Sequence, residues 1–145
     1  MLFRSQVMTD RDKKIEDVIS RGIGYRDLPV PYKFGGKYYK NQSFDCSSFV
    51  QACYYRWLGV ESSSNPDGMP RVSRDQAKYG TEVAEEDIQR GDLLFFDTNN
   101  DGVINHVGIY LGDGKMLHTA DAGEGIVIDF WRQRYSRLIT ARRVL

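Results

Sequence analysis

The sequence predicts a single α+β domain in which helices come first and an antiparallel sheet follows. Its 145 residues, 1–145, are the length of one ordinary domain. Apolar side chains recur at helical spacing in the first half, whereas short strand-like segments follow one another after Gly91. Because helices and strands are segregated in this way, we expect N-terminal helices packed on an antiparallel sheet of five to six strands.

The first helix is predicted over residues 10–22. Ile15, Val18 and Ile19 stand three and four residues apart behind a polar start, which is the spacing of one helix face. The prolines and glycines of residues 29–36 then predict extended or turning backbone.

The second helix is predicted over residues 45–58. Its apolar positions again step by three and four, and Gly59 provides a common helix end. Ser73 and Gln76 have the spacing of a capping box, which predicts a short helix over residues 73–79.

Five strands are predicted in the second half. They cover residues 93–97, 105–111, 115–120, 126–130 and 138–144. In order along the chain, these segments form an antiparallel meander.

The charge balance excludes several classes of protein. There are 20 basic and 20 acidic side chains, and hydrophobic residues make up 41% of the chain. This composition excludes a disordered, collagen-like or coiled-coil chain. It also gives no reason to expect a nucleic-acid partner. Apolar runs fall far short of about 20 residues, so we expect no membrane span.

The N-terminus carries no signal-peptide pattern. Residues 1–10 lack a sustained apolar run and are expected to be a flexible or appended start to the domain. A larger secreted parent chain or a phage tail would carry its address elsewhere. The expected location is therefore extracellular or in the cell wall, with a phage virion as the alternative.

Cys46 stands at the start of the second predicted helix. Unpaired backbone N–H groups and the helix dipole at this position favour a thiolate and could hold an oxyanion. Cys53 lies seven residues further on, among apolar neighbours, where simple packing is expected. Seven residues of helix separate the two by roughly 10 Å, which excludes a disulfide between them and a shared zinc ion.

The chain has two histidines, His106 and His118, and both fall in one predicted hairpin. If Gly112, Asp113 and Gly114 form a three-residue loop, Gly108 faces His118 and both imidazoles share one face of the sheet. A two-residue turn of Asp113 and Gly114 would shift the register by one and separate them.

With both rings on one face, Cys46, His106 and His118 have the composition of a thiol acyl-transfer triad. One imidazole would take the proton from Cys46 and the other would orient the first. This chemistry needs no cofactor.

Two other polar features receive structural interpretations. The segment 97–102 matches the first half of a calcium loop, but Gly108 stands where the twelfth position requires a glutamate. We therefore expect a polar connection and no metal site. The C-terminal arginines, Arg132, Arg134, Arg137, Arg142 and Arg143, are expected to lie on a solvated face.

Several blocks in order along the chain resemble those of the NlpC family of cell-wall cysteine peptidases. They read YKFGG at 32–36, FDCSSFV at 44–50, GDLLFF at 91–96, HVGIYLG at 106–112 and MLH at 116–118. The resemblance implies a papain-like fold and cleavage of peptidoglycan stem peptides, most often between γ-D-glutamate and a diamino acid. Ser48 departs from the glycine usual there, and Phe34 from the usual tryptophan.

The resemblance also implies a role for each matching residue. Cys46 would be the nucleophile, His106 the general base and His118 the residue that orients it. Tyr32 would lie near the nucleophile and assist with the oxyanion or the substrate. Asp45 and Ser47 match positions that in some members hold the free N-terminal amine of the substrate.

Two alternatives differ in chemistry from this interpretation. An amidase of the CHAP type shares the order of cysteine and histidine and would cut peptidoglycan at the sugar lactyl group. A wall-binding or phage-tail module would keep the fold without turnover. In each case the expected partner is peptidoglycan or a muropeptide.

Overall fold

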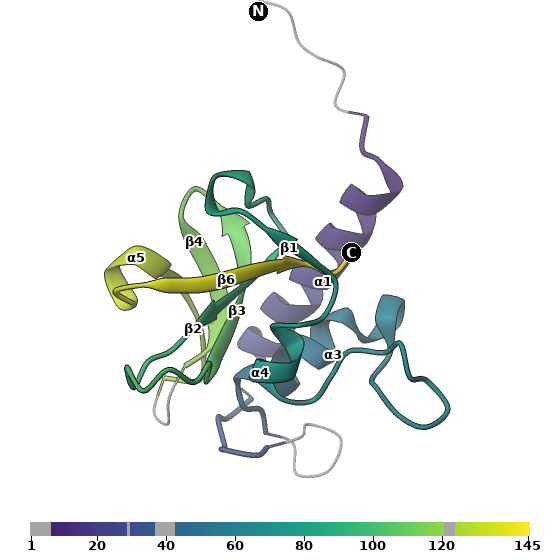
Figure 1. The fold of residues 1–145 in the computed structure, drawn as a ribbon. Helices are drawn as coiled ribbons and strands as arrows, with labels where there is room; N and C mark the ends of the chain where they lie inside the picture. Colours follow the sequence, from purple (N-terminus) through teal and green to yellow (C-terminus); the bar gives the residue numbers. More distant parts are fainter. Residues whose placement is uncertain (1–6, 29, 37–42, 121–123) are drawn as a thin grey trace, which may run out of the picture.

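The computed structural model describes residues 7–28, 30–36, 43–120 and 124–145 (Figure 1). Three helices come first: α1 (Asp10–Asp27), α3 (Cys46–Leu58) and α4 (Ser73–Gln76). The strands that follow are β1 (Thr81–Val83), β2 (Leu93–Phe96), β3 (His106–Gly112), β4 (Lys115–Thr119), β5 (Ile126–Phe130) and β6 (Leu138–Arg143). A 3₁₀ turn, η1 (Glu85–Asp87), follows β1, and a one-turn helix, α5 (Trp131–Arg134), precedes β6.

The six strands form one antiparallel sheet in the order β1-β6-β2-β3-β4-β5. The predicted meander holds from β2 to β5, but β6 returns across the sheet to lie between β1 and β2 (Figure 1). The predicted α+β class and the five to six antiparallel strands are confirmed. Strand β1 and helix α5 were not predicted, because three or four residues are too few to show a period.

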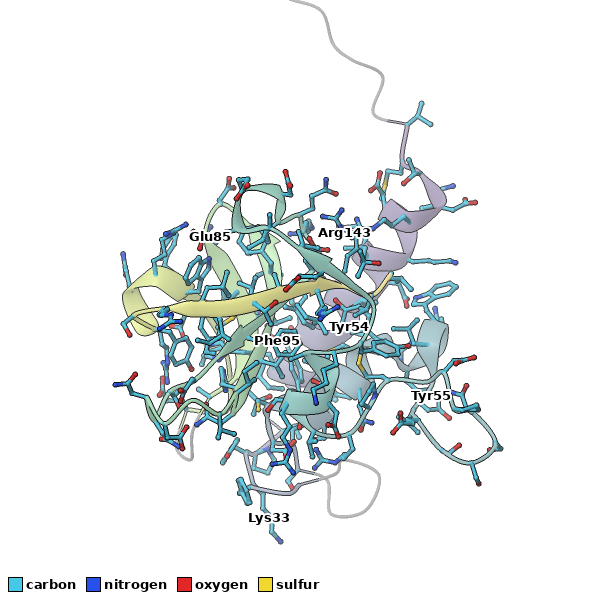
Figure 2. All side chains as sticks on the ribbon, in the orientation of Figure 1. Lys33, Tyr54, Tyr55, Glu85, Phe95 and Arg143 are labelled. Atoms are coloured by element: carbon cyan, nitrogen blue, oxygen red, sulfur yellow. The ribbon has the colours of Figure 1, made fainter. Side chains whose placement is uncertain are left out.

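Helices α1 and α3 cover one face of the sheet (Figure 1). Alternate strand side chains such as Phe95, Val107 and Leu117 point to this face and are fully buried against the helices. Tyr54 of α3 also points into this layer, whereas its neighbour Tyr55 points outward (Figure 2). A second apolar cluster, which includes Phe96 and Trp131, covers the opposite face.

Helix α1 is longer than its apolar spacing predicts. Thr9 and Asp12 cap its start reciprocally, and the helix continues through Gly22 to Asp27. Gly22 does not end the helix but is buried within it, close to the core. A Cβ atom there would lie 2.7 Å from Leu117 Cδ2.

Helix α3 ends at Leu58, as predicted, and Gly59 adopts a positive φ of 65°. The expected capping box at Ser73 is wrong. The N-cap of α4 is Val72, which makes no side-chain cap, and Gln76 instead donates from its amide to the carbonyl oxygens of Ser47 and Pro70.

The β3–β4 hairpin combines the two registers that the sequence left open. Asp113 and Gly114 form a two-residue turn with positive φ at both positions, so that Gly112 pairs with Lys115. A bulge at Leu111 then shifts the register, and Tyr110 pairs with Met116 as a three-residue loop would require. The bulge therefore places both imidazoles on one face despite the short turn.

Each helix in the described ranges is too short or too polar to span a bilayer.

Candidate active site

Cys46 is the first residue of α3, and Asp45 is its N-cap. The Asp45 carboxylate accepts the Ser48 N–H at 2.9 Å, and the Ser48 hydroxyl accepts the Asp45 N–H at 3.0 Å. The serine that replaces the usual glycine thus completes a capping box. The cap fixes the turn on which the Cys46 thiol is carried.

The Cys46 thiol is protonated at neutral pH in this environment. Burial raises its pKa to about 11, and the negative charge of Asp45 adds to the rise. Backbone N–H groups of Val107 and Ser47 oppose the rise but do not overcome it. The Sγ atom lies 3.8 Å from the carbonyl oxygen of Asn105. The expectation that the helix terminus favours a resting thiolate is therefore wrong, because desolvation outweighs the terminus.

The two imidazoles contact each other directly. His106 begins β3 and His118 lies near the end of β4, and His106 Nε2 is 2.8 Å from His118 Nδ1. The ring centroid of Tyr135 lies 5.1 Å from the ring centroid of His106 and 6.0 Å from that of His118. The predicted meeting of the two rings is confirmed.

Both imidazoles are neutral at pH 7. Burial, then His118 and Arg134, lower the pKa of His106 to about 3. Burial also lowers the pKa of His118, although hydrogen bonding to Asp129 opposes this effect. The site at rest therefore holds a neutral thiol and two neutral rings.

A cavity of about 350 Å³ joins the thiol to the first imidazole. Cys46 and His106 both line it, and Tyr32 and Phe34 form part of its wall. Phe34 is 87% exposed, so this aromatic residue of the cavity wall is open to solvent. Tyr32 and Cys46 therefore line the same cavity.

Asp45 and Ser47 flank Cys46 in the chain but are not among the residues that line this cavity. Arg71 donates to both oxygens of the Asp45 carboxylate, at 3.1 and 2.9 Å, and to the Ser47 hydroxyl at 2.9 Å. The backbone N–H of Gly35 donates to the same carboxylate. Burial opposes ionisation of Asp45, but Arg71 and Ser48 outweigh it and hold its pKa below the usual range. This network ties the cavity wall to the start of α3.

Sequence reasoning missed three residues around the site. Arg71 has no motif of its own and meets Asp45 only through the tertiary fold. Asp129 Oδ2 lies 2.7 Å from His118 Nε2, and Arg134 Nη1 donates to the same oxygen at 3.1 Å. Asp129 could have been found only from the β4–β5 register, which pairs it with Met116 and puts it on the face of His118.

The arginines of the C-terminal cluster have separate partners. Arg134 binds Glu124 and Asp129, whereas Arg132 binds Glu85 and Arg143 binds the buried Asp92. The expectation of one solvated face is therefore wrong for Arg134, which lines the cavity.

The remaining polar features have structural roles. Both cysteines are free, and Cys53 is fully buried, with a pKa that burial raises well above that of Cys46. The Asp97 carboxylate accepts backbone N–H groups of Asn99, Asp101 and Gly102, so it closes the turn between β2 and β3. Within the described ranges, three metal-binding side chains do not come together.

Three curated proteins similar to this chain are named as peptidases, two of them as endopeptidases of murein or peptidoglycan. The gamma-D-glutamyl-L-lysine dipeptidyl-peptidase of Bacillus subtilis is 40% identical over 114 residues, which are 78% of this chain and 34% of that protein. The murein DD-endopeptidase MepH of Escherichia coli is 32% identical, over 83% of this chain and 43% of that protein. The peptidoglycan DL-endopeptidase CwlO of Bacillus licheniformis is 33% identical, over 96% of this chain and 30% of that protein. The chain thus spans less than half the length of these relatives.

Solved structures agree with the fold. An NlpC/P60 family protein from Bacillus cereus superimposes with a TM-score of 0.73 at 31% identity, over 90% of this chain and 40% of that one. The NlpC/p60 domain of the peptidoglycan hydrolase SagA superimposes with a TM-score of 0.70 at 26% identity, over 89% of this chain and 97% of that one. The model of the NlpC/P60 family matches residues 29–143, and the chain belongs to that family.

Proposed function

We propose that this chain is a cysteine endopeptidase that hydrolyses peptidoglycan stem peptides at the bond between γ-D-glutamate and a diamino acid. One observation carries the proposal: Cys46, on a helix N-terminus, shares a cavity with His106, whose Nε2 is already engaged by His118. The names of the relatives support peptidoglycan as the substrate, and the relative at 40% identity is named for a γ-D-glutamyl-L-lysine bond.

The reaction starts from neutral groups. The pKa of Cys46 is about 11 and that of His106 about 3, so a preformed thiolate–imidazolium pair is not the resting state. The proton must move as the sulfur attacks, which makes His106 a general base in the transition state. Because His118 engages Nε2 of His106, we assign the base to the other ring nitrogen of His106, Nδ1.

The reaction proceeds by acylation of Cys46 and then hydrolysis of the thioester. The Cys46 thiol gives its proton to His106 Nδ1 while sulfur bonds to the carbonyl carbon of the scissile amide. The resulting imidazolium gives that proton to the leaving amine, the C–N bond breaks, and a thioester remains on Cys46. Water attacks the thioester with His106 again as base, the C–S bond breaks, and the sulfur leaves protonated.

The oxyanion would be held at the start of α3. The Asp45 carboxylate already engages the backbone N–H of Ser48, so the N–H groups of Cys46 and Ser47 are the donors of the first turn that we propose for this role. Tyr32 lines the same cavity, and we propose that its hydroxyl adds to this group.

Asp45 and Ser47 stabilise the turn at the start of α3 in this proposal. Their bonds to Arg71 hold the turn that carries Cys46, and this is the function that we propose for them. The predicted contact with a substrate amine stays a prediction. So do the extracellular, cell-wall or phage location and a larger parent chain.

A digest of muropeptides tests the proposal. The purified chain should release fragments that end in D-glutamate, identified by mass spectrometry. Cys46→Ala should abolish this release. Cys53→Ala is the matched control and should retain most of the activity, because Cys53 is fully buried and does not line the cavity.

Other products of the muropeptide digest would assign a different activity to the chain. Release of a free sugar lactyl group would assign the chain as an amidase. New ends between D-alanine and the diamino acid would assign a DD-endopeptidase. Equal digestion by Cys46→Ala would refute the nucleophile, and no product from the unaltered chain would indicate a module that has lost turnover.

A further inference from the structure

Asp129 contacts the imidazole of His118 and is not among the residues that line the cavity. It lies on β5, opposite Met116, and its Oδ2 is 2.7 Å from His118 Nε2. The His118 side chain is fully buried and that of Asp129 is 28% exposed. A carboxylate can only accept a hydrogen bond, so the proton of neutral His118 lies on Nε2. Nδ1 of His118 then carries a lone pair.

This arrangement settles the direction of the next hydrogen bond. His118 Nδ1 must accept, so His106 Nε2 must donate across the 2.8 Å that separates them. The proton of neutral His106 is thus on Nε2, and its Nδ1 carries the lone pair that a general base needs. Reversal of the His118 tautomer would reverse both bonds and put a proton on His106 Nδ1.

Arg134 holds the carboxylate in this role. Its Nη1 donates to the same Oδ2 at 3.1 Å, and its terminal nitrogens also bind Glu124 at 2.9 and 2.6 Å. The guanidinium is therefore anchored on one side and keeps the Asp129 oxygen aimed at His118.

We propose that Asp129 is a positioning residue, which acts through His118 to keep the proton of His106 on Nε2 and the lone pair on Nδ1. The inference rests on the proposed function, because only a base at His106 gives this tautomer a use. Asp129 does not touch the substrate in this scheme. It sets the state of the two rings before the substrate arrives.

The test compares Asp129→Leu with Asp129→Asn. Leu is similar in size and removes the acceptor. Asn keeps an amide oxygen, which Arg134 should draw to the position of Oδ2, so that variant retains the acceptor and loses the charge. If the Leu variant does not fold, Asp129→Ala replaces it.

Nitrogen-15 NMR at pH 7 reports the tautomers directly. The chain has two histidines, so four ring nitrogens account for every imidazole signal. We expect both rings to carry the proton on Nε2 in the unaltered chain and in Asp129→Asn. In Asp129→Leu we expect the Nδ1–H forms to become populated.

Activity on the muropeptide should change in parallel. For Asp129→Leu we expect kcat to fall by a factor of roughly 10 to 10³ with KM nearly unchanged, in line with the usual contribution of an oriented base. Asp129→Asn should lie between this variant and the unaltered chain. Asp113→Asn, at the tip of the β3–β4 hairpin, makes the same change of charge away from both rings and should leave kcat and the tautomers as they are.

Three results would overturn the proposal: unchanged tautomers in Asp129→Leu, altered tautomers with full kcat, or an equal loss in Asp113→Asn. If the unaltered chain cleaves no peptide, the proposed function fails. The NMR measurement would then still decide whether Asp129 sets the tautomers.

Discussion

Raising the pH should strongly accelerate alkylation of Cys46. The reactive form is the thiolate, and a pKa of about 11 leaves a thiolate fraction on the order of 10⁻⁴ at pH 7 and 10⁻² at pH 9. The rate constant for reaction with iodoacetamide should therefore rise about 100-fold over these two pH units. It should continue to rise toward pH 11, provided that the fold persists. Near pH 6 to 7 we expect no inflection, because the pKa of His106 is about 3.

The measurement is a time course of alkylation at each pH, with peptides from the two cysteines quantified by mass spectrometry. Cys53 provides the internal control, since it is fully buried and burial raises its pKa further. It should react much more slowly than Cys46 at every pH at which the chain is folded. Circular dichroism at each pH checks that condition.

A rate for Cys46 that is constant between about pH 5 and 8 would refute this reasoning. Such a plateau is the signature of a thiolate already paired with an imidazolium. Burial would then not dominate the pKa of the thiol, and the general-base scheme would give way to a preformed ion pair. Equal rates for Cys46 and Cys53 would contradict the assignment of Cys46 as the accessible thiol.

Two further predictions concern stability. Arg71→Met leaves the largely buried Asp45 carboxylate without its ion pair, so we expect a loss of about 1–3 kcal/mol and a fall in Tm of roughly 3–10 °C at pH 7. Because the folded pKa of Asp45 is lowered, this contribution is present above the unfolded pKa and is lost as the pH falls through the folded value; the difference in Tm should shrink accordingly in acid. Gly108→Ala puts a Cβ 2.3 Å from Met116 Sδ and 3.1 Å from His118 Cβ, so it should cost about 1–3 kcal/mol in urea unfolding and also lower kcat.

Each of these variants has a matched control. Arg74→Met, at an exposed arginine three residues further on, should change stability by less than about 0.5 kcal/mol. Gly24→Ala, in α1, meets no atom within 4 Å and should stabilise the chain by roughly 0.5–1 kcal/mol. An equal loss in a variant and its control would contradict the contact invoked for that variant.

Patterns along the chain predicted those features that depend on neighbours in sequence. The apolar spacing of residues 45–58 predicted α3, and Gly59 predicted its end, because a helix face repeats every three to four residues. The same reasoning predicted that α1 ends at Gly22, five residues too early. Gly22 lies inside the helix and packs close to Leu117, a residue far along the chain that local spacing does not reveal.

The hairpin shows where such reasoning reaches its limit. The Asp113–Gly114 turn and the shared face of His106 and His118 were each predicted, but as mutually exclusive registers. The bulge at Leu111 reconciles them. Nothing local in the sequence distinguishes a bulged leucine from a paired one, because the choice is made by packing across the sheet.

The sequence by itself determined the class of fold, the pair of histidines on one hairpin, and a cysteine at a helix N-terminus. Each of these follows from residue type and spacing within about 20 residues. The tertiary structure alone decided the protonation of the thiol and the chain of contacts from His106 through His118 to Asp129 and Arg134. The physical reason is that pKa values and tautomers depend on burial and on partners brought together from separate strands and loops, and residue spacing encodes neither.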